Sequence, residues 1–266
     1  MTHIPEDHPR YASLITRERI VEGVQMGITS QQGLVAQGRG EAFDYLIGER
    51  TIESAAVAER VAVAYLLTAQ KPIISVNGNT AALVPGALVS LADVTGAQLE
   101  VNLFHRSDAR MHRIVEHLKA HGAGKVLGSK GDARLDLSHD RAIVDQEGIY
   151  EADVVLVPLE DGDRCQKLVE MGKIVIAVDL NPLSRTSLSA TVTIADNVTR
   201  ALENMIQFTK EMKKDSKKQL QAIIDSYDNR RVLADAMYAI QEHLKNQAGR
   251  RSEERRVGKE CRSRWS

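Results

Sequence analysis

Short apolar stretches and longer amphipathic stretches alternate along most of the chain. The apolar stretches carry no regular polar interruption, which is typical of parallel strands buried on both faces of a sheet. Such strands are predicted at residues 72–76, 98–104, 152–158 and 173–178. Further short strands are expected at residues 191–194 and near Val126. The hydrophobic pattern therefore predicts a sheet whose strands come from the middle of the chain.

Helical patterns separate and flank these strands. Apolar residues recur at roughly helical spacing in segments 10–27, 52–69, 109–121, 197–214 and 217–244. Residues 123–150, with many Gly and Asp, are expected to be irregular. Strands that alternate with helices pair in parallel through right-handed crossovers. The predicted fold class is therefore α/β, a parallel sheet flanked by helices, with additional N-terminal and C-terminal helices.

Composition agrees with this prediction. Of the 266 residues, 43% are hydrophobic and only 4% are aromatic, so Ala, Val, Leu and Ile make up most of the apolar content. These are the usual residues of a helix-covered parallel sheet. No internal repeat or low-complexity linker interrupts the chain, so residues 1–250 are interpreted as a single domain.

The last sixteen residues, RSEERRVGKECRSRWS, differ abruptly from the rest. They hold six Lys or Arg, the only Trp and one of the two Cys. They also resemble the in-frame translation of a common sequencing-library adapter. We interpret residues 251–266 as an artefact tail, disordered and outside the domain. The alternative is a basic tail that binds nucleic acid.

The charge and the cysteine content limit which ligands and which cellular compartment are expected for this protein. The tail holds six of the 35 basic and three of the 36 acidic residues, which leaves 29 basic against 33 acidic residues. This balance gives no sign of nucleic-acid binding. Cys165 remains as a single cysteine without an internal disulfide partner, which favours a reducing cytoplasm. No signal peptide opens the chain and no apolar run reaches the ~20 residues of a membrane span, so no membrane role is expected.

Polar residues follow the first strand, at the edge where α/β sheets bind ligands. Asn77, Gly78, Asn79 and Thr80 come directly before a helical pattern. Gly permits a close approach, and free amides at a helix N-terminus can hold a phosphate or carboxylate. The alternative is an ordinary Asn-Gly turn with Thr80 as the N-cap.

Three carboxylates, Glu160, Asp161 and Asp163, follow the third strand. Oxygen ligands of this kind could share Mg²⁺, or the acidic residues could cap the next helix. His117 and His121, four residues apart, are a weaker metal candidate and otherwise lie on a solvated helix face.

The fourth strand ends at Asp179, where an acidic side chain can accept hydrogen bonds from ribose hydroxyls. Arg185 has a planar group suited to phosphate oxygens, and Asp196 precedes another helix. A turn and an N-cap without any ligand would explain the same residues. A glycine-rich phosphate loop is missing, since Gly38 and Gly40 neither follow a strand nor complete the dinucleotide pattern.

Six blocks of the sequence together resemble the archaeal phosphopantothenate synthetase family, also called 4-phosphopantoate–β-alanine ligase. The blocks are HPRYASL at 8–14, GRGEAFDYLIGE at 38–49, SVNGNTAALVP at 75–85, EGIYEADVVLVPLEDGDR at 147–164, VDLNPLSRTSLSATVTIADN at 178–197 and YDNR at 227–230. The resemblance implies a homodimeric enzyme with a Rossmann-like core that catalyses a step of coenzyme A biosynthesis. Its substrates would be ATP, 4-phosphopantoate and β-alanine, and its products 4-phosphopantothenate, AMP and diphosphate.

The resemblance also implies roles for individual residues. The expected ATP contacts are Arg17, Arg39, Asp179, Leu180, Asn181, Arg185, Thr186, Asp196, Asn197 and Val198. Arg39 and Arg185 are predicted as catalytic residues, which would stabilise charge on the phosphates during transfer. Gln37 stands where His is expected in relatives, which removes any acid or base role at that position.

The other substrates would then occupy the remaining strand ends. Asn77, Gly78 and Asn79 are assigned to 4-phosphopantoate. Glu160, Asp161 and Asp163 are assigned to Mg²⁺ or to the ammonium group of β-alanine. The stoichiometry implies a phosphopantoyl adenylate, and no general base for the amine is identified. Two other functions stay open, an NAD-dependent oxidoreductase with an atypical nucleotide loop and a non-catalytic sensor of adenine nucleotides.

Overall fold

The computed structural model describes residues 4–8, 10–159 and 161–263, and side chains as far as residue 249. Glu160 therefore lies outside the described residues. A six-stranded parallel sheet forms the centre, with the order β3-β2-β1-β6-β7-β8. The strands are β1 (Pro72–Val76), β2 (Gln98–Val101), β3 (Val126–Leu127), β6 (Val154–Pro158), β7 (Ile174–Val178) and β8 (Val192–Ile194). All six predicted strands are confirmed, some with shorter bounds.

The strand order makes the fold Rossmann-like. From β1 the chain moves outward to β2 and β3, then returns to β6 on the other side of β1 and continues to β7 and β8. The order therefore reverses between β1 and β6, and the crossovers leave a crevice at the carboxyl ends of these two strands. This crevice is where a ligand is expected in an open parallel sheet.

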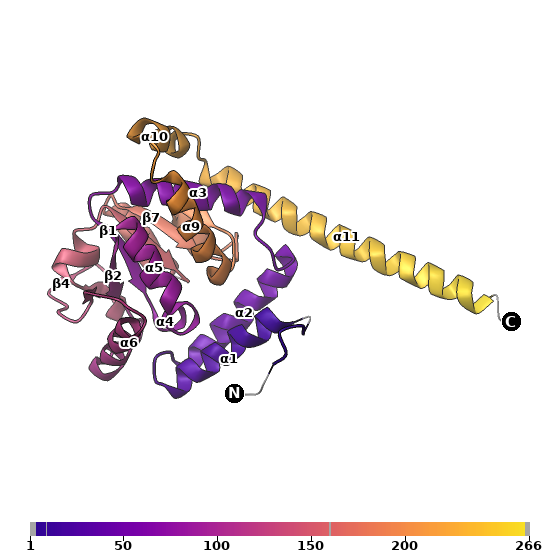
Figure 1. Cartoon of the computed structure of the whole chain (residues 1–266), viewed down its shortest axis with the longest axis horizontal. Helices are drawn as coiled ribbons and strands as arrows, with labels where there is room; N and C mark the ends of the chain where they lie inside the picture. Colours follow the sequence, from indigo (N-terminus) through magenta and orange to yellow (C-terminus); the bar gives the residue numbers. More distant parts are fainter. Residues whose placement is uncertain (1–3, 9, 160, 264–266) are drawn as a thin grey trace.

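Alternating side chains of the strands build a core on each face of the sheet. Ile74 and Val76 belong to the cluster beneath the long helices, whereas Ile73 belongs to the opposite cluster. The first face is covered by α3 (Glu53–Thr68), α5 (Pro85–Thr95) and α9 (Val198–Met212) (Figure 1). The opposite face packs against α7 (Gly162–Glu170) and the segment after β3. Because the sheet is buried on both faces, the sequences of its strands are unbroken runs of apolar residues.

Three helices lie beside the carboxyl edge of the sheet. They are α1 (Tyr11–Gln25), α2 (Gln31–Ile47) and α4 (Gly78–Leu83). Figure 1 shows α1 and α2 side by side, with α4 close to α1. Gly38 and Gly40 lie inside α2, so they are helical residues and form no phosphate loop. The helices that cover the crevice thus come from the N-terminal part of the chain.

The segment between β3 and β6 is irregular, as predicted, and its backbone is held in place by hydrogen bonds to buried carboxylates. It contains β4 (Ala133–Arg134), β5 (Ile143–Val144) and two short turns, η1 (Asp140–Ala142) and η2 (Gln146–Tyr150). Glu100 is fully buried and accepts hydrogen bonds from the backbone N–H groups of Asp145 and Ile149, at 3.0 and 2.6 Å. Burial raises the pKa of Glu100 to about 7.

One predicted helix is wrong. Residues 217–244 form two helices, α10 (Lys217–Asp225) and α11 (Asn229–Ser263). The break arises because Thr193 on β8 donates its backbone N–H to both the Tyr227 hydroxyl and Asn229 Oδ1. Asp228 accepts a hydrogen bond from the Arg230 N–H and so starts the second helix. The break residues therefore attach the C-terminal helices to the edge of the sheet.

Helix α11 continues to Ser263 and extends beyond the body of the molecule (Figure 1). Most of segment 251–266 is thus helical where a disordered tail was expected. That this segment is an adapter-derived artefact stays a prediction.

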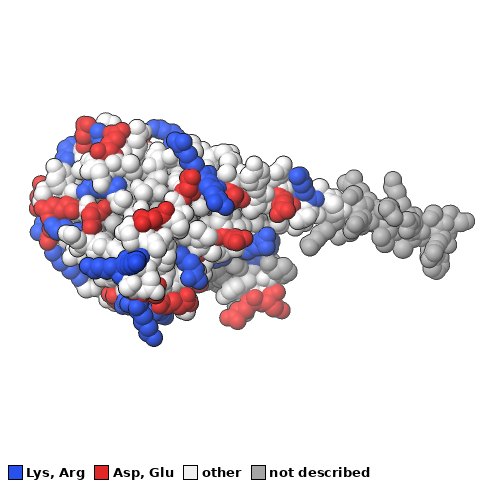
Figure 2. Space-filling view, turned by 90° about the horizontal axis from the view of Figure 1, so that it is seen from above, with Lys and Arg blue, Asp and Glu red and all other residues white. Residues whose placement is uncertain are grey.

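The surface carries charges of both signs. On the face drawn in Figure 2, Lys and Arg are interspersed with Asp and Glu, and the described residues form no broad area of one sign. Within the described part of the chain, no helix is both long and apolar enough to cross a membrane.

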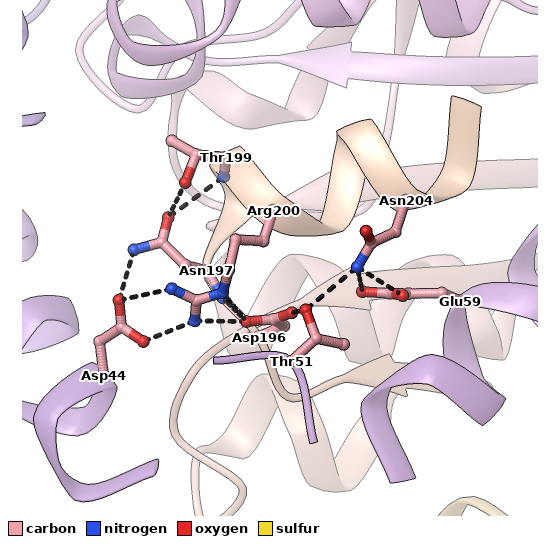
Figure 3. A network of polar contacts seen from close by, with 8 residues as sticks. All are labelled: Asp44, Thr51, Glu59, Asp196, Asn197, Thr199, Arg200 and Asn204. Atoms are coloured by element: carbon pink, nitrogen blue, oxygen red, sulfur yellow. Dashed lines mark hydrogen bonds and ion pairs between the residues drawn. The ribbon is translucent and has the colours of Figure 1, made fainter. Parts of the chain in front are cut away.

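A polar network is buried between α3 and α9 (Figure 3). Glu59 on α3 is fully buried and accepts hydrogen bonds from Asn204 on α9, at 3.1 and 3.3 Å. Asn204 also donates to the Thr51 hydroxyl, which in turn donates to Asp196. Burial, followed by the negative charge of Asp196, raises the pKa of Glu59 to about 8. At neutral pH this carboxyl group is therefore protonated.

Replacing Glu59 by Gln should remove a pH dependence of stability. Between pH 4.5 and about 8 the unfolded chain ionises Glu59 while the folded protein keeps it protonated, so wild-type stability falls as the pH rises. Each pH unit in this window is worth about 1.4 kcal/mol. Urea unfolding of wild type and Glu59→Gln at pH 5 and pH 8.5 should show the variant gaining a few kcal/mol relative to wild type.

The exposed Glu53 on the same helix provides the matched control, Glu53→Gln. This control should follow the wild-type profile. Parallel profiles for wild type and Glu59→Gln would show that Glu59 does not hold a proton in the folded state.

Candidate active site

Two adjoining cavities open at the carboxyl ends of the strands. The first has a volume of about 420 Å³ and is lined by residues that follow β1, β2 and β6. The second, of about 260 Å³, is lined by residues that follow β6 and β7. Ala36, Arg39 and Leu159 line both, so the cavities share a wall. This position matches the crevice at the reversal of strand order.

Leu159 in the shared wall has an unusual backbone. Its φ is 55°, in the left-handed region that a β-carbon disfavours. Its N–H donates to Val178 O at 3.0 Å, and its carbonyl accepts from Asn77 Nδ2 at 3.2 Å. Neighbouring strands on both sides thus hold the residue in this conformation. Backbone strain of this kind is often found at binding sites.

Asn77 joins the ends of β1 and β6. Its Nδ2 donates to Pro158 O at 2.9 Å as well as to Leu159 O, and its Oδ1 accepts from Thr80 N at 3.0 Å. Asn77 is therefore the N-cap of α4, and the expectation that Thr80 would be the cap is wrong. The amide group of Asn77 is fully used within the fold, so it shapes the cavity wall.

Asn79 and Gly78 stand where other segments approach closely. Asn79 donates to Gly33 O at 3.0 Å and accepts from the Thr29 hydroxyl. A β-carbon at position 78 would lie 2.6 Å from Ile28 O and would also clash with the Arg110 guanidinium. Only Gly fits there, because both groups approach its α-carbon. The structure thus gathers residues 77–79 at the first cavity, with both Asn side chains bonded to protein groups.

Arg110 on α6 (Asp108–Ala120) brings a positive charge to the first cavity. Its Nε donates to Ile28 O at 2.9 Å and its Nη1 to His105 O at 3.1 Å. Among the described residues no carboxylate forms an ion pair with it. Burial and then the nearby charge of Arg141, which lines the same cavity, lower the pKa of Arg110. With Arg39, this cavity is lined by three arginines against one carboxylate, Asp161, a balance that favours an anionic ligand.

The second cavity contains the turn that follows β7. Asp179 accepts hydrogen bonds from the Asn181 N–H at 2.9 Å and from the Ser184 hydroxyl at 2.5 Å. Burial raises the pKa of Asp179, while these hydrogen bonds and the nearby Arg39 charge oppose that shift. Leu180 and Thr186 are buried and also line the cavity. The structure thus brings together five of the predicted ATP contacts, which are Arg39, Asp179, Leu180, Asn181 and Thr186.

Arg185 begins the short helix α8 (Arg185–Ser189) between two residues that line this cavity. Its side chain is 70% exposed and forms an ion pair with Asp163 on α7. Neither Arg185 nor Asp163 is among the residues that line the two cavities. To contact a nucleotide phosphate in the cavity, the Arg185 side chain would have to leave its exposed ion pair with Asp163.

Asp161 lines the first cavity and caps α7 by accepting a hydrogen bond from the Asp163 N–H at 3.2 Å. Its carboxylate lies 3.4 Å from His139 Nε2. Within the described residues, no three His, Cys, Asp or Glu side chains are close enough together to hold a metal ion. The predicted set also includes Glu160, which lies outside the described residues, so its assignment to Mg²⁺ stays a prediction. His117 and His121 lie on α6 with tilted rings whose centres are 4.5 Å apart, His117 half-buried and His121 exposed.

The two faces of α2 separate Arg39 from Arg17. Arg39 and Phe43 line the second cavity, whereas Gln37 and Glu41 line a different hollow together with Arg17. Arg17 donates to both oxygens of Glu41, at 2.7 and 2.5 Å. The two sets lie on opposite sides of the helix at 3.6 residues per turn. Within one chain, Arg17 is thus not brought to the cavity that contains Asp179.

Asp196, Asn197 and Val198 also face the interior of the protein. Asp196 is 1% exposed and accepts hydrogen bonds from the Asn197 N–H and the Thr51 hydroxyl, at 2.6 and 2.5 Å. Asn197 is the N-cap of α9, and Val198 is buried. None of the three lines either cavity. That they contact ATP stays a prediction.

Sequence reasoning missed Arg110, Arg141, Ser184 and Phe43. Arg110 lies in the first turn of the helix that follows the second strand, so extending the search from the strand end into that helix would have identified it. Arg141 lies in the irregular segment, where no period indicates which side chains face inward. Ser184 lies in the turn that the sequence did identify, but its bond to Asp179 depends on the fold of that turn.

Comparison with known proteins shows the family of the chain. Residues 54–243 match the model of a family described as phosphopantothenate/pantothenate synthetase. The 4-phosphopantoate–β-alanine ligase of Methanosarcina mazei is 66% identical over 93% of this chain and 98% of its own. The ligase of the same name from Thermococcus kodakarensis is 51% identical over 92% and 94%, and that from Methanospirillum hungatei is 51% identical over 91% and 98%. The chain therefore belongs to the phosphopantothenate/pantothenate synthetase family.

Proposed function

We propose that this protein is an ATP-dependent ligase that joins 4-phosphopantoate to β-alanine in coenzyme A biosynthesis. Its products would be 4-phosphopantothenate, AMP and diphosphate. The observation that carries the proposal is the pair of adjoining cavities with Arg39 in the shared wall. A reaction between a nucleotide and an anionic acid needs two such sites, open to each other. The names and high identity of the relatives supply the substrate class.

The first cavity suits 4-phosphopantoate. Within the part of the chain that the structure describes, the Arg110 side chain donates hydrogen bonds only to carbonyl oxygens, and it lies near the charge of Arg141. A phosphate group between these side chains would relieve their repulsion through charge-assisted hydrogen bonds. Gly78 leaves room for that approach. The acid's carboxylate would then point toward the shared wall.

The second cavity suits the nucleotide. Asp179 can accept hydrogen bonds from ribose hydroxyls, as acidic residues do at this position in dinucleotide-binding folds. Asn181 and Thr186 line the same cavity and provide polar groups around it. Arg39 in the shared wall would contact the α-phosphate, where the two substrates meet. Arg185 would add a second positive charge once it leaves its exposed pair with Asp163.

Chemistry would proceed in two displacements. A carboxylate oxygen of 4-phosphopantoate attacks the α-phosphorus of ATP, and diphosphate leaves. The amine of β-alanine then attacks the carbonyl carbon of the adenylate, and AMP leaves with the bonding electron pair. Arg39 and Arg185 stabilise the charge that develops on the phosphate oxygens, and the cavities hold the reactants in line.

Three further features complete the proposal. Mg²⁺ would arrive bound to the ATP phosphates and neutralise their charge, with Asp161 as the carboxylate that lines the first cavity. The enzyme would act as a homodimer, as the family resemblance implies, and would work in the cytoplasm. Cys165, a buried thiol, is compatible with a reducing compartment.

A product assay tests the proposed function directly. A chain of residues 1–250, incubated with ATP, Mg²⁺, 4-phosphopantoate and β-alanine, should release AMP and diphosphate in equal amounts. Release of ADP and phosphate would instead indicate an acyl phosphate. ATP binding without turnover would favour a nucleotide sensor, and tight binding of NADH without binding of ATP would favour an oxidoreductase.

Replacing Arg110 by Ala should raise KM for 4-phosphopantoate. Loss of a charge-assisted contact is worth about 1.5 to 3 kcal/mol, or roughly a 10- to 100-fold change. KM for ATP should change little, because Arg110 lines only the first cavity. Arg113→Ala, an exposed arginine on the same helix, is the control. If both variants keep the wild-type KM, the phosphate does not bind at Arg110.

Replacing Arg39 by Ala should lower kcat/KM for ATP by roughly 10- to 100-fold or more, since this side chain would contact the reacting phosphate. Arg185→Ala should also lower kcat/KM. Steady-state kinetics at saturating 4-phosphopantoate and β-alanine would measure both effects. Wild-type kinetics in both variants would rule out the assigned nucleotide site.

A further inference from the structure

The network of Figure 3 connects two elements that bear expected nucleotide contacts. Helix α2 carries Arg39 and, five residues later, Asp44. The N-terminus of α9 carries Asn197 and, three residues later, Arg200. Asp44 and Arg200 line neither cavity, so neither can touch a ligand held there. Their contacts with each other nonetheless join the two elements directly.

Arg200 bridges two carboxylates from different parts of the chain. It donates to both oxygens of Asp44, with Nη2 at 2.6 Å from Oδ1 and Nη1 at 3.2 Å from Oδ2. It also donates to Asp196 Oδ1, from Nε at 2.9 Å and from Nη2 at 2.5 Å. Only a planar guanidinium can contact two carboxylates in this way, because the ammonium group of Lys is a single point charge. The bridge therefore fixes both the distance and the orientation of α2 relative to α9.

Asn197 strengthens the same junction. Its Nδ2 donates to Asp44 Oδ2 at 2.9 Å, while its Oδ1 accepts from the Thr199 N–H and caps α9. The side chains of Asp44 and Asp196 are only 10% and 0% exposed, and that of Arg200 is 26% exposed. Buried ion pairs add little net stability because desolvation opposes the attraction. Their value lies in geometry, since every buried donor and acceptor must keep its partner.

Arg39 depends on this geometry because its side chain forms no hydrogen bond or ion pair with the residues that the structure describes. It is exposed, and its place in the shared wall is set by the position of α2. Asp44 lies about 7.5 Å further along the helix axis, at 1.5 Å per residue. Phe43, next to Asp44, lines the second cavity and makes the link between the network and the cavity wall.

We propose that Arg200 and Asp44 are positioning residues that fix α2 against the start of α9 and so hold Arg39 where it contacts the nucleotide. This inference rests on the proposed function, because it takes ATP as the ligand of the second cavity. It assigns a role in the reaction to two residues that do not contact the substrates. Loss of the bridge should let α2 shift, and a displacement of about 1 Å can change rates by two orders of magnitude.

The test compares Arg200→Lys and Asp44→Asn with wild type over the full chain. Both variants should raise KM for ATP by at least about tenfold, while KM for β-alanine changes less than about twofold. Calorimetric titration with ATP should show the same loss of affinity. Combining the two substitutions should cost little more than either alone, since both remove one shared interaction.

Thr209→Val on α9 is the matched control for a purely structural effect. Thr209 is fully buried on the same helix and donates only to Met205 O of its own helix, at 2.7 Å. This variant should lose thermal stability yet keep the wild-type KM for ATP. If Arg200→Lys and Asp44→Asn lower the melting temperature but keep the wild-type KM, the network has only a structural role and the inference is wrong.

Failure of the inference and failure of the proposed function give different results. If wild type forms no AMP from ATP, 4-phosphopantoate and β-alanine, the proposed function is wrong. If wild type does so and both variants bind ATP as tightly as wild type, the positioning role alone is wrong. Additive losses in the double variant would also contradict a shared bridge.

Discussion

The hydrogen bonds of Asn77 across the ends of β1 and β6 are the constraint on which the site depends. Parallel strands at a reversal of order diverge beyond their last ladder bonds, because their helices cross to opposite faces. Asn77 spans that divergence by donating to Pro158 O and Leu159 O. With its carbonyl held in this way, Leu159 keeps a left-handed backbone and forms the wall between two cavities. The shape of the crevice therefore depends on the backbone at the strand ends and on the Asn77 side chain that holds it, and not on the charged groups that line it.

Charged groups are then arranged around that wall by helices rather than by a phosphate loop. Arg110 comes from α6 and Arg39 from α2, and each is held in place by packing of its helix. In a phosphate loop, backbone amides surround the anion and the chain itself sets their positions. Here the relative positions of helices matter instead, so ion pairs such as Arg200 with Asp44 gain a role away from the ligand. A site of this design is sensitive to substitutions outside its surface.

Several predicted nucleotide contacts have structural partners instead of facing the cavities. Asp196 and Asn197 could be recognised as a strand end that precedes a helix, but their carboxylate and amide bond to Thr51 and Asp44. These partners are about 150 residues away in sequence, with separations of 145 and 153. No local pattern contains that information. The predicted helix over residues 217–244 was wrong for a similar reason, because Thr193 on the edge strand holds the residues of the break.

The sequence by itself determined the strands, most of the helices and the family. Burial on both faces leaves an unbroken apolar run, and burial on one face leaves a helical period, so each is visible in the residues alone. The sequence also pointed to Asp179, because it follows a strand directly, and to Asn181 and Thr186 through the family resemblance. Only the tertiary structure decided that Arg39 stands between two cavities, that Arg17 faces away from them and that Arg110 approaches Gly78. Those outcomes depend on which faces of separate helices meet, and that is set by packing across the whole chain.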